Sequence, residues 1–265
     1  MSVALFKRER FEALRVARGV TLGAPLTLHT LTGSTNDDAL AAARAGTPHG
    51  ATFVAERQSQ GRGRRGRTWF AADGESLLCS VLLRIPLPPA SVSLLALAAG
   101  LAVREAVAHA LPEFEECGLV RVKWPNDVWV ENRKIAGVLA ESQVQGGVLS
   151  AAVVGFGVNV VTAVFPEDIA HSATSLALLG ASVAREPLLV DVLSALEART
   201  QLLLAGGAPG LARELSQKDA LAGRKVRVDG IEGVASGIDS QGRLLLRLST
   251  EQIVEVSAGT VELVG

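Results

Sequence analysis

The spacing of apolar residues predicts a series of short strands in the N-terminal part of the chain. Residues 26–31 alternate apolar and polar side chains, and residues 51–55 and 76–84 are almost wholly apolar, so each segment predicts a strand. Residues 120–130 and 134–141 flank a short polar turn and predict a hairpin, with a further strand at 148–154. Because these later strands follow one another directly, the pattern predicts an α+β fold with a mixed or antiparallel central sheet and flanking helices.

Helices are predicted where apolar residues recur every three or four positions. Residues 2–18 fit a short amphipathic helix, and Ser34 or Thr35 is placed to cap a second helix that runs to Ala43. A long alanine-rich helix is expected from residue 91 to 110, and further helices are expected at 175–179, 187–204 and 209–216. One helix before the first strand is too little for a three-helix DNA-binding domain.

The character of the chain changes after the last predicted helix. Five short apolar segments separated by Gly, Asp and Ser turns follow residue 223, which is typical of a small β-barrel. We therefore expect a catalytic or binding domain at 1–217 and a small barrel at 218–265. A barrel of this size is marginally stable alone and is expected to pack on the larger domain.

Composition restricts the classes of protein that fit. The chain has 265 residues, 48% hydrophobic content and a net charge of −1, which suits a soluble globular protein and opposes a nucleic-acid-binding role. Cys79 and Cys117 are isolated and form no metal-like pattern with histidine, so no metal site is expected from protein side chains alone. Residues 1–15 lack a signal-peptide core, and Arg104 and Glu105 interrupt the most apolar segment. We expect a cytoplasmic protein without a membrane span.

A basic, glycine-rich segment stands out against this neutral background. Five arginines lie between residues 57 and 67, and Gly61, Gly63 and Gly66 are interspersed among them. Glycine lets backbone N–H groups approach a ligand, and arginine forks bind phosphate or carboxylate, so the segment predicts an anion-binding loop. A solvated basic loop is the alternative, but the two flanking core strands argue against it. We expect the loop to be mobile when empty and ordered by an anion.

Three other segments could share a site with this loop. The predicted hairpin carries Lys123, Asn126, Asp127 and Lys134, and Lys123 could equally be an exposed strand residue. The helix that starts near Ser34 presents free N–H groups, and the glycines of 155–157 predict a kinked strand with close backbone approach. No P-loop or dinucleotide-binding motif is present. The residues alone indicate an enzyme or binder of a phosphorylated ligand.

Five motifs, in order, resemble those of biotin protein ligases. They are Ser34-Thr35-Asn36, the run from Gly61 to Arg67 followed by Trp69, Lys123-Trp124-Pro125-Asn126-Asp127, Arg133-Lys134-Ile135-Ala136-Gly137, and Gly155-Phe156-Gly157-Val158-Asn159. The resemblance covers residues 26–160, and the trailing barrel is similar to the SH3-like C-terminal domain of that family. It implies a fold like that of class II aminoacyl-tRNA synthetases.

The resemblance also implies a two-step reaction. Biotin and Mg-ATP would form biotinyl-5′-AMP and pyrophosphate, and the biotinyl group would then pass to a lysine of a biotin carboxyl carrier protein domain. ATP, Mg²⁺ and biotin are thus the expected small molecules. The carrier domain of a biotin-dependent carboxylase is the expected partner, a homodimer is possible in this family, and no nucleic-acid or membrane partner is expected. The short N-terminal part suggests the monofunctional type without a DNA-binding domain.

Residue roles can be carried over from the matching motifs. The residues implied to contact biotin are Ser34, Thr35, Asn36 and Gln58. Arg62, Gly63 and Arg64 would surround the biotin carboxylate and phosphate, while Arg67 and Trp69 would support the nucleotide and Asn159 the adenine. Catalytic roles fall to Lys134, Arg62 and Asp127, and the binding set is completed by Gly61, Asn126 and Gly137. No basic residue follows Arg247, which leaves open whether the barrel contacts nucleotide.

Other functions remain compatible with parts of the sequence. A lipoate ligase or a lipoyl/octanoyl transferase resembles the same fold and also acylates a carrier lysine, although the arginine run and the Lys-Trp-Pro-Asn-Asp motif favour biotin. A nucleic-acid-binding protein is opposed by the net charge of −1. A protein that binds biotinyl-AMP without transferring it is a third alternative.

Overall fold

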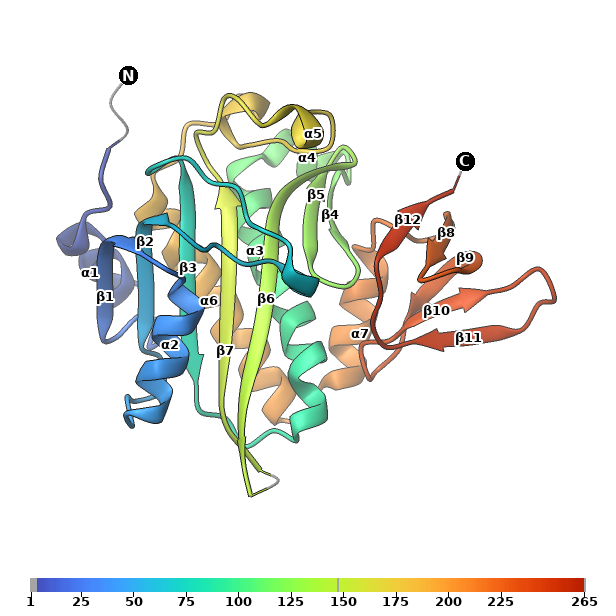
Figure 1. The fold of residues 1–265 in the computed structure, drawn as a ribbon, viewed down its shortest axis with the longest axis horizontal. Coiled ribbons are helices and arrows are strands. Elements are labelled where there is room, and N and C mark those ends of the chain that lie inside the picture. The colour runs from blue at the N-terminus through green and yellow to red at the C-terminus, as the bar shows by residue number, and fades with distance from the viewer. Residues whose placement is uncertain (1–3, 147, 265) are drawn as a thin grey trace.

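The computed structural model describes residues 4–146 and 148–264, which form two sheets with helices packed around the larger one (Figure 1). The larger sheet has seven strands in the order β1-β2-β3-β7-β6-β5-β4. Their bounds are β1 Leu26–Thr32, β2 Thr52–Gln58, β3 Ser76–Leu83, β4 Val120–Lys123, β5 Asp127–Val130, β6 Arg133–Gln145 and β7 Val148–Asn159. β1 runs parallel to β2 and the other neighbours are antiparallel, so the predicted mixed sheet is confirmed.

Helices cover both faces of the seven-stranded sheet. They are α1 Arg8–Ala17, α2 Thr35–Arg44, α3 Val92–Ala110, α4 Pro112–Glu116, α5 Glu167–Ala170, α6 Arg185–Leu204 and α7 Ala208–Gln217. Ala39 and Ala43 of α2 pack on Phe53, Leu82 and Val153, whereas the next residues along these strands belong to the main core. Because successive strand residues point to opposite faces, α2 lies on one face and the main core on the other. Figure 1 shows α2 in front of the sheet and α3 and α6 behind it.

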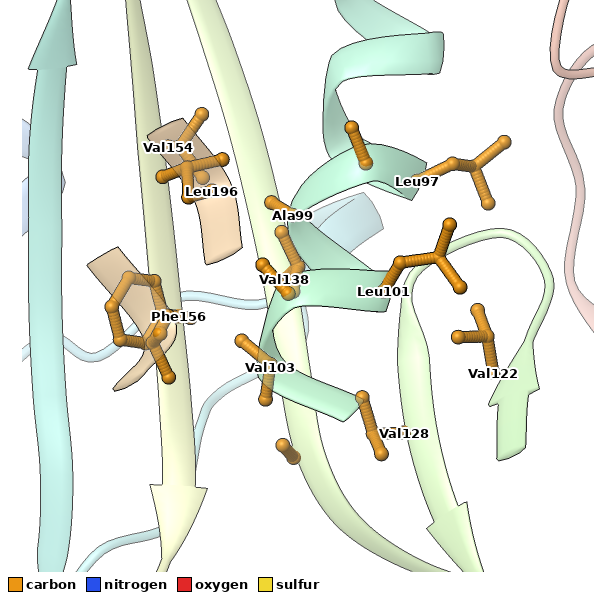
Figure 2. Close-up of a cluster of buried hydrophobic side chains, with 14 of the residues drawn as sticks. Leu97, Ala99, Leu101, Val103, Val122, Val128, Val138, Val154, Phe156 and Leu196 are labelled. Atoms are coloured by element: carbon orange, nitrogen blue, oxygen red, sulfur yellow. The ribbon is translucent and has the colours of Figure 1, made fainter. Parts of the chain in front are cut away.

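The main core is built around α3, which is apolar on nearly every side. Leu97, Leu101 and Val103 of α3 meet valines of β4, β5 and β6, and Leu196 of α6 approaches from the other side (Figure 2). The segment Pro89–Ala110 is long and apolar enough to cross a membrane, but 67% of its apolar window is buried inside the protein. A helix enclosed by a sheet and a second helix needs apolar residues all round, so α3 is the core helix that the sequence predicts.

The smaller sheet contains the five strands expected near the C-terminus. They are β8 Lys225–Val228, β9 Ile231–Ile238, β10 Leu244–Arg247, β11 Ile253–Val256 and β12 Val261–Leu263. Their order is β11-β10-β9-β8-β12, and all pairs are antiparallel. Within the described residues β11 and β12 do not pair, so the sheet is open and the closed barrel is not confirmed. Its buried valines and leucines join the main core, which attaches the sheet to the larger unit.

Two local predictions fail for physical reasons. β7 was expected to kink at its glycines, but its register with β3 and β6 is continuous from Ala152 to Asn159. Partner strands on both sides supply ladder hydrogen bonds there, which keeps the strand regular. Ser34 occupies the N-cap position of α2 in an extended conformation, yet neither Ser34 nor Thr35 makes a side-chain capping bond. Thr35 uses its hydroxyl elsewhere, in the site described below.

Candidate active site

A cavity of about 720 Å³ lies on the same side of the large sheet as α2. It is enclosed by the start of α2, the strands β3, β6 and β7, the β4–β5 hairpin, and residues 61–69, here called the arginine loop. Figure 1 shows the arginine loop crossing in front of β7 and β6. The structure brings together every predicted site residue except Gly61, since the cavity lining includes Ser34, Thr35, Asn36, Gln58, Arg62, Gly63, Arg64, Arg67, Trp69, Asn126, Asp127, Lys134, Gly137 and Asn159.

The floor of the cavity is formed by one face of β7. Gly155, Gly157 and Asn159 are alternate residues, so they point to the same side of the strand. A Cβ at Gly155 would lie 1.9 Å from Asn36 Oδ1, and one at Gly157 would lie 2.5 Å from the ring of Trp69. The glycines therefore leave room for a polar side chain and an aromatic ring to rest directly on the sheet.

Neutral polar groups fill the part of the cavity next to α2. The Gln58 side-chain oxygen accepts hydrogen bonds from the backbone N–H of Thr35 at 2.7 Å and from its hydroxyl at 3.0 Å. The Ser80 hydroxyl donates to Asn36 Oδ1 at 2.6 Å and lies 2.7 Å from the Thr35 hydroxyl. Ser34, Thr35 and Asn36 are all buried. Buried amides and hydroxyls held in a fixed network are suited to recognising a neutral polar ligand group.

The arginine loop is a tight turn whose two limbs pair with each other. Gly63 N–H donates to Arg67 O at 2.7 Å, and Trp69 N–H donates to Gly61 O at 3.0 Å. A Cβ at Gly61 would lie 3.1 Å from Trp69 O, which accounts for glycine at this position although it does not line the cavity. Pairing of the limbs fixes the turn, from which Arg62 reaches Asp37 and Glu141 while Arg65 reaches Asp229.

Two arginines of the loop differ in their surroundings. Arg62 Nη2 binds Asp37 Oδ1 at 2.6 Å and Glu141 Oε2 at 3.0 Å, and Glu141 also accepts a 2.6 Å hydrogen bond from Asn36 Nδ2. Burial, reinforced by the charge of neighbouring Arg65, lowers the pKa of Arg64. A positive charge that is partly removed from water gains more from an incoming anion than an exposed charge would.

Lys134 is the basic group in the part of the cavity beside Trp69. Its Nζ lies 2.7 Å from Asp127 Oδ1 and 5.4 Å from the centroid of the Trp69 ring. Asp127 and Lys134 lie on the neighbouring strands β5 and β6, where Asp127 is paired with Gly137 and Lys134 with Trp129, so the hairpin brings the two side chains close together. The Trp69 Nε1 atom is buried and has no hydrogen-bond partner among the described residues. An unpaired indole N–H beside a lysine is available to a ligand acceptor.

Lys123 also belongs to the site, which resolves the two alternatives for this residue. Lys123 lines the cavity, where its Nζ donates to Val261 O at 3.1 Å and lies 4.7 Å from the centroid of Trp129. Burial lowers the pKa of Lys123, with Lys134 and Arg67 acting in the same direction and Asp127 opposing them. A negatively charged ligand would reduce the repulsion among these cations.

The two asparagines of the predicted set are held by backbone atoms. Asn126 Nδ2 donates to Val138 O at 2.7 Å, and Asn159 Nδ2 donates to Thr174 O at 2.9 Å. Both amide nitrogens are therefore engaged, which leaves the side-chain oxygen atoms for a ligand.

Sequence reasoning missed several residues around the cavity. Ser80 is the one hydroxyl in the middle of an apolar strand, and Glu141 ends an apolar run, so both carried a weak signal. Gly259, Thr260 and Val261 gave none, because their contact with the cavity depends on how the C-terminal sheet packs. Phe165 and Asp168 reach the lining from α5 and the segment before it, which carry no predictive pattern.

Comparisons with known proteins decide the family. Residues 30–159 match the Biotin/lipoate A/B protein ligase family, and residues 223–264 match the Biotin protein ligase C terminal domain. The chain is 40% identical over 240 residues to the biotin--[acetyl-CoA-carboxylase] ligase of Mycobacterium tuberculosis, which covers 87% of this chain and 85% of that protein. The chain belongs to the biotin protein ligase family. The match to the C-terminal domain covers strands β8 to β12 of the small sheet.

Further matches are also to biotin protein ligases. The bifunctional ligase/repressor BirA of Escherichia coli is 34% identical over 203 residues, covering 74% of this chain but 61% of that protein. A biotin protein ligase from Aquifex aeolicus in complex with biotin and ATP superposes with a TM-score of 0.75 at 28% identity, covering 91% of this chain and 98% of that one. The expected biotin-ligase-like fold is thereby confirmed.

Proposed function

We propose that this chain activates biotin with ATP and transfers the biotinyl group to a lysine of a biotin carboxyl carrier protein domain, as its relatives named biotin--[acetyl-CoA-carboxylase] ligase do. The observation that carries this proposal is the division of one cavity into two chemically different parts. The amides and hydroxyls of Thr35, Asn36, Gln58 and Ser80 lie next to α2, with Arg62 at their edge, where it binds Asp37 and Glu141. Lys123 and Lys134 lie in the part of the cavity beside Trp69 and Trp129. A ligand with a neutral polar head and a charged reactive end fits such a cavity.

In the first step, a carboxylate oxygen of biotin attacks the α-phosphorus of ATP. The new bond joins carboxylate and phosphate, the bond to the β-phosphate oxygen breaks, and pyrophosphate leaves with the electron pair. Lys134 is placed to stabilise negative charge at the α-phosphate, since a lysine is a mobile point charge that follows changing geometry. Arg62 would bind the biotin carboxylate, in place of Asp37 and Glu141, which it binds in this structure.

In the second step, the ε-amine of the carrier lysine attacks the carbonyl carbon of the acyl-adenylate. An amide bond forms, the bond between carbonyl carbon and phosphate oxygen breaks, and AMP leaves while the amine loses a proton. Asp127 is the nearest carboxylate to Lys134 and is placed to receive that proton or to orient the attacking amine.

Binding roles follow the positions of the remaining residues. Ser34, Thr35, Asn36 and Gln58 would hold the ring and tail of biotin, and Gly63 and Arg64 would contact the carboxylate and phosphate. Trp69 and Arg67 would support the nucleotide, with Gly137 leaving room for the ring, because a Cβ there would lie 3.0 Å from Trp69. Asn126 would fix the hairpin through Val138, and Asn159 would face the adenine.

Magnesium would reach the site with the nucleotide. The described residues contain no group of three or more His, Cys, Asp or Glu side chains that could hold a metal ion. Mg²⁺ is commonly bound by phosphate oxygens with one or two carboxylates, and the cavity offers Asp127 and Asp168. When bound, the ion would neutralise the charge on the leaving pyrophosphate.

Domain organisation and cellular location are also proposed. We propose a catalytic domain at 1–217 and a C-terminal domain at 218–265, the latter related to the SH3-like fold despite its open sheet. We propose a cytoplasmic location, in keeping with the burial of α3. We also propose that the chain can form a homodimer.

The decisive experiment measures exchange of pyrophosphate into ATP with biotin or lipoate, followed by labelling of a carrier domain. We expect exchange with biotin and transfer to the carrier. Exchange with lipoate alone would reject the proposal in favour of a lipoate ligase, and adenylate formation without labelling would favour a binding protein. Retained binding to DNA after Arg62→Ala and Arg64→Ala together would point to a nucleic-acid site on another surface.

A further inference from the structure

Arg65, at the tip of the arginine loop, binds the C-terminal sheet. Its Nη1 and Nη2 atoms donate to Asp229 Oδ1 and Oδ2 at 2.8 and 2.6 Å, and Nη1 also donates to the Thr260 hydroxyl at 3.1 Å. The Thr260 N–H donates to Asp229 Oδ1 at 3.0 Å. A bidentate pair with both carboxylate oxygens engaged has a defined geometry that a single contact lacks.

The backbone at Arg65 is in an unfavourable conformation. Arg65 has φ of 56° and Asp229 has φ of 45°, in the left-handed region that side chains other than Gly, Asn and Asp rarely adopt. For arginine this conformation must be held by surrounding contacts, and strain of this kind concentrates at functional sites. The hydrogen bond from Arg65, aided by that from Thr260, lowers the pKa of Asp229 to about 2, so the carboxylate is charged throughout the neutral range.

The C-terminal sheet is anchored to the larger unit independently of the loop. Trp124 Nε1 donates to Gly242 O at 2.9 Å, and Val122 exchanges backbone hydrogen bonds with Lys218 and Ala220. Trp124 is fully buried, so this attachment is rigid. Arg65 thus ties a glycine-rich loop to a fixed support, and residues 259–261 at that support also line the cavity.

We propose that Arg65, Asp229 and Thr260 form a latch that holds the arginine loop closed over the acyl-adenylate. The latch rests on the proposed function, and its members are positioning residues that act through Arg62, Arg64 and Arg67. While the latch is closed, the adenylate waits for the carrier lysine. When the latch opens, water reaches the carbonyl carbon, the bond to phosphate breaks, and biotin and AMP are lost without transfer.

The test compares Arg65→Ala, Asp229→Asn and the double variant. Each protein is loaded with biotin and ATP, and escape of the adenylate is followed after a chase with excess unlabelled ligand. We expect escape about three to ten times faster in each single variant, because the pair is solvent-exposed but bidentate. The double variant should be no faster than the singles, since all three remove one interaction. Glu232→Gln, which removes another exposed carboxylate of the same sheet, is the matched control and should resemble the wild type.

A second measurement is independent of the ligase activity. Trypsin cleavage within residues 62–67 is followed by mass spectrometry in ligand-free Asp229→Asn, Glu232→Gln and wild-type protein. We expect faster cleavage only in Asp229→Asn, with an unchanged melting temperature. Equal cleavage rates, or additive effects of the two substitutions on escape, would overturn the latch. Absence of biotin-dependent exchange in the wild type would instead reject the proposed function and leave the cleavage result to decide on the latch.

Discussion

At the scale of single residues, the proposed chemistry depends most on Lys134. It is half-exposed, its Nζ lies 2.7 Å from Asp127 Oδ1, and it stands beside the Trp69 ring, whereas biotin is proposed to bind next to α2. Its charge can therefore serve the transition state without contributing to the binding of the biotin ring.

We expect Lys134→Ala to slow adenylate formation by about a hundredfold or more, because removal of one electrostatic stabiliser commonly has this effect. Biotin binding, measured by calorimetry, should stay close to that of the wild type. Lys134→Arg keeps the charge and is the control, with an intermediate rate. Unchanged pyrophosphate exchange in Lys134→Ala would reject the residue as catalytic.

At the scale of secondary-structure elements, strand β7 shows how small residues shape the cavity. Gly155 and Gly157 leave the strand regular but let Asn36 and Trp69 lie against its backbone. The glycines are thus required by close approach and not by an unusual φ, since neither is among the residues with positive φ.

For this reason Gly157→Ala should displace the Trp69 ring. Overpacking of this kind costs on the order of 1–3 kcal/mol, so we expect the KM for ATP to rise by about tenfold, with a smaller change for biotin. Gly210→Ala, in α7 with open space around it, is the control and should leave both values unchanged. Equal changes in the two KM values would contradict the placement of Trp69 beside the nucleotide.

The motifs could be predicted as a group because most lie at the start or end of strands that share one end of the sheet. The apolar pattern placed β1 and β3 to within one residue but ended β2 at residue 55, three residues before its observed end, and it predicted the long helix α3. The kink expected in β7 failed, since the sequence of a strand does not reveal whether partners on both sides keep it straight. The roles of Ser80, Glu141 and Arg65 depend on contacts between segments far apart in sequence, which periodicity cannot show.

On the scale of the whole molecule, the two units meet at a buried acid. Asp219 is 2% exposed, its Oδ1 accepts a hydrogen bond from Leu221 N–H, and its Oδ2 has no partner among the described residues. Burial raises its pKa to about 6, against the opposing hydrogen bond and the charge of Arg121. The folded protein therefore binds this proton more tightly than the unfolded chain does, and the free energy of unfolding should fall as pH rises from about 4 to about 6.

Replacing this acid by its amide should remove that dependence. Relative to the wild type, Asp219→Asn should gain stability by roughly 3 kcal/mol between pH 4 and pH 7, because the folded pKa is about two units above the unfolded value. Denaturant unfolding at several pH values measures the difference, and Asp73→Asn at an exposed position is the control. If the two proteins differed in free energy of unfolding by the same amount at every pH, the pKa of Asp219 would not be raised in the folded protein.

The contribution of residues 259–261 to the cavity has a consequence for how the protein is made. The arginine loop leaves the ribosome before residues 259–261, which complete the lining, have been synthesised. Until then, Lys123 lacks the carbonyl of Val261 and Arg65 lacks Asp229 and Thr260. A chain released prematurely would therefore have an incomplete site, so the ability to retain a reactive intermediate is tied to completion of synthesis.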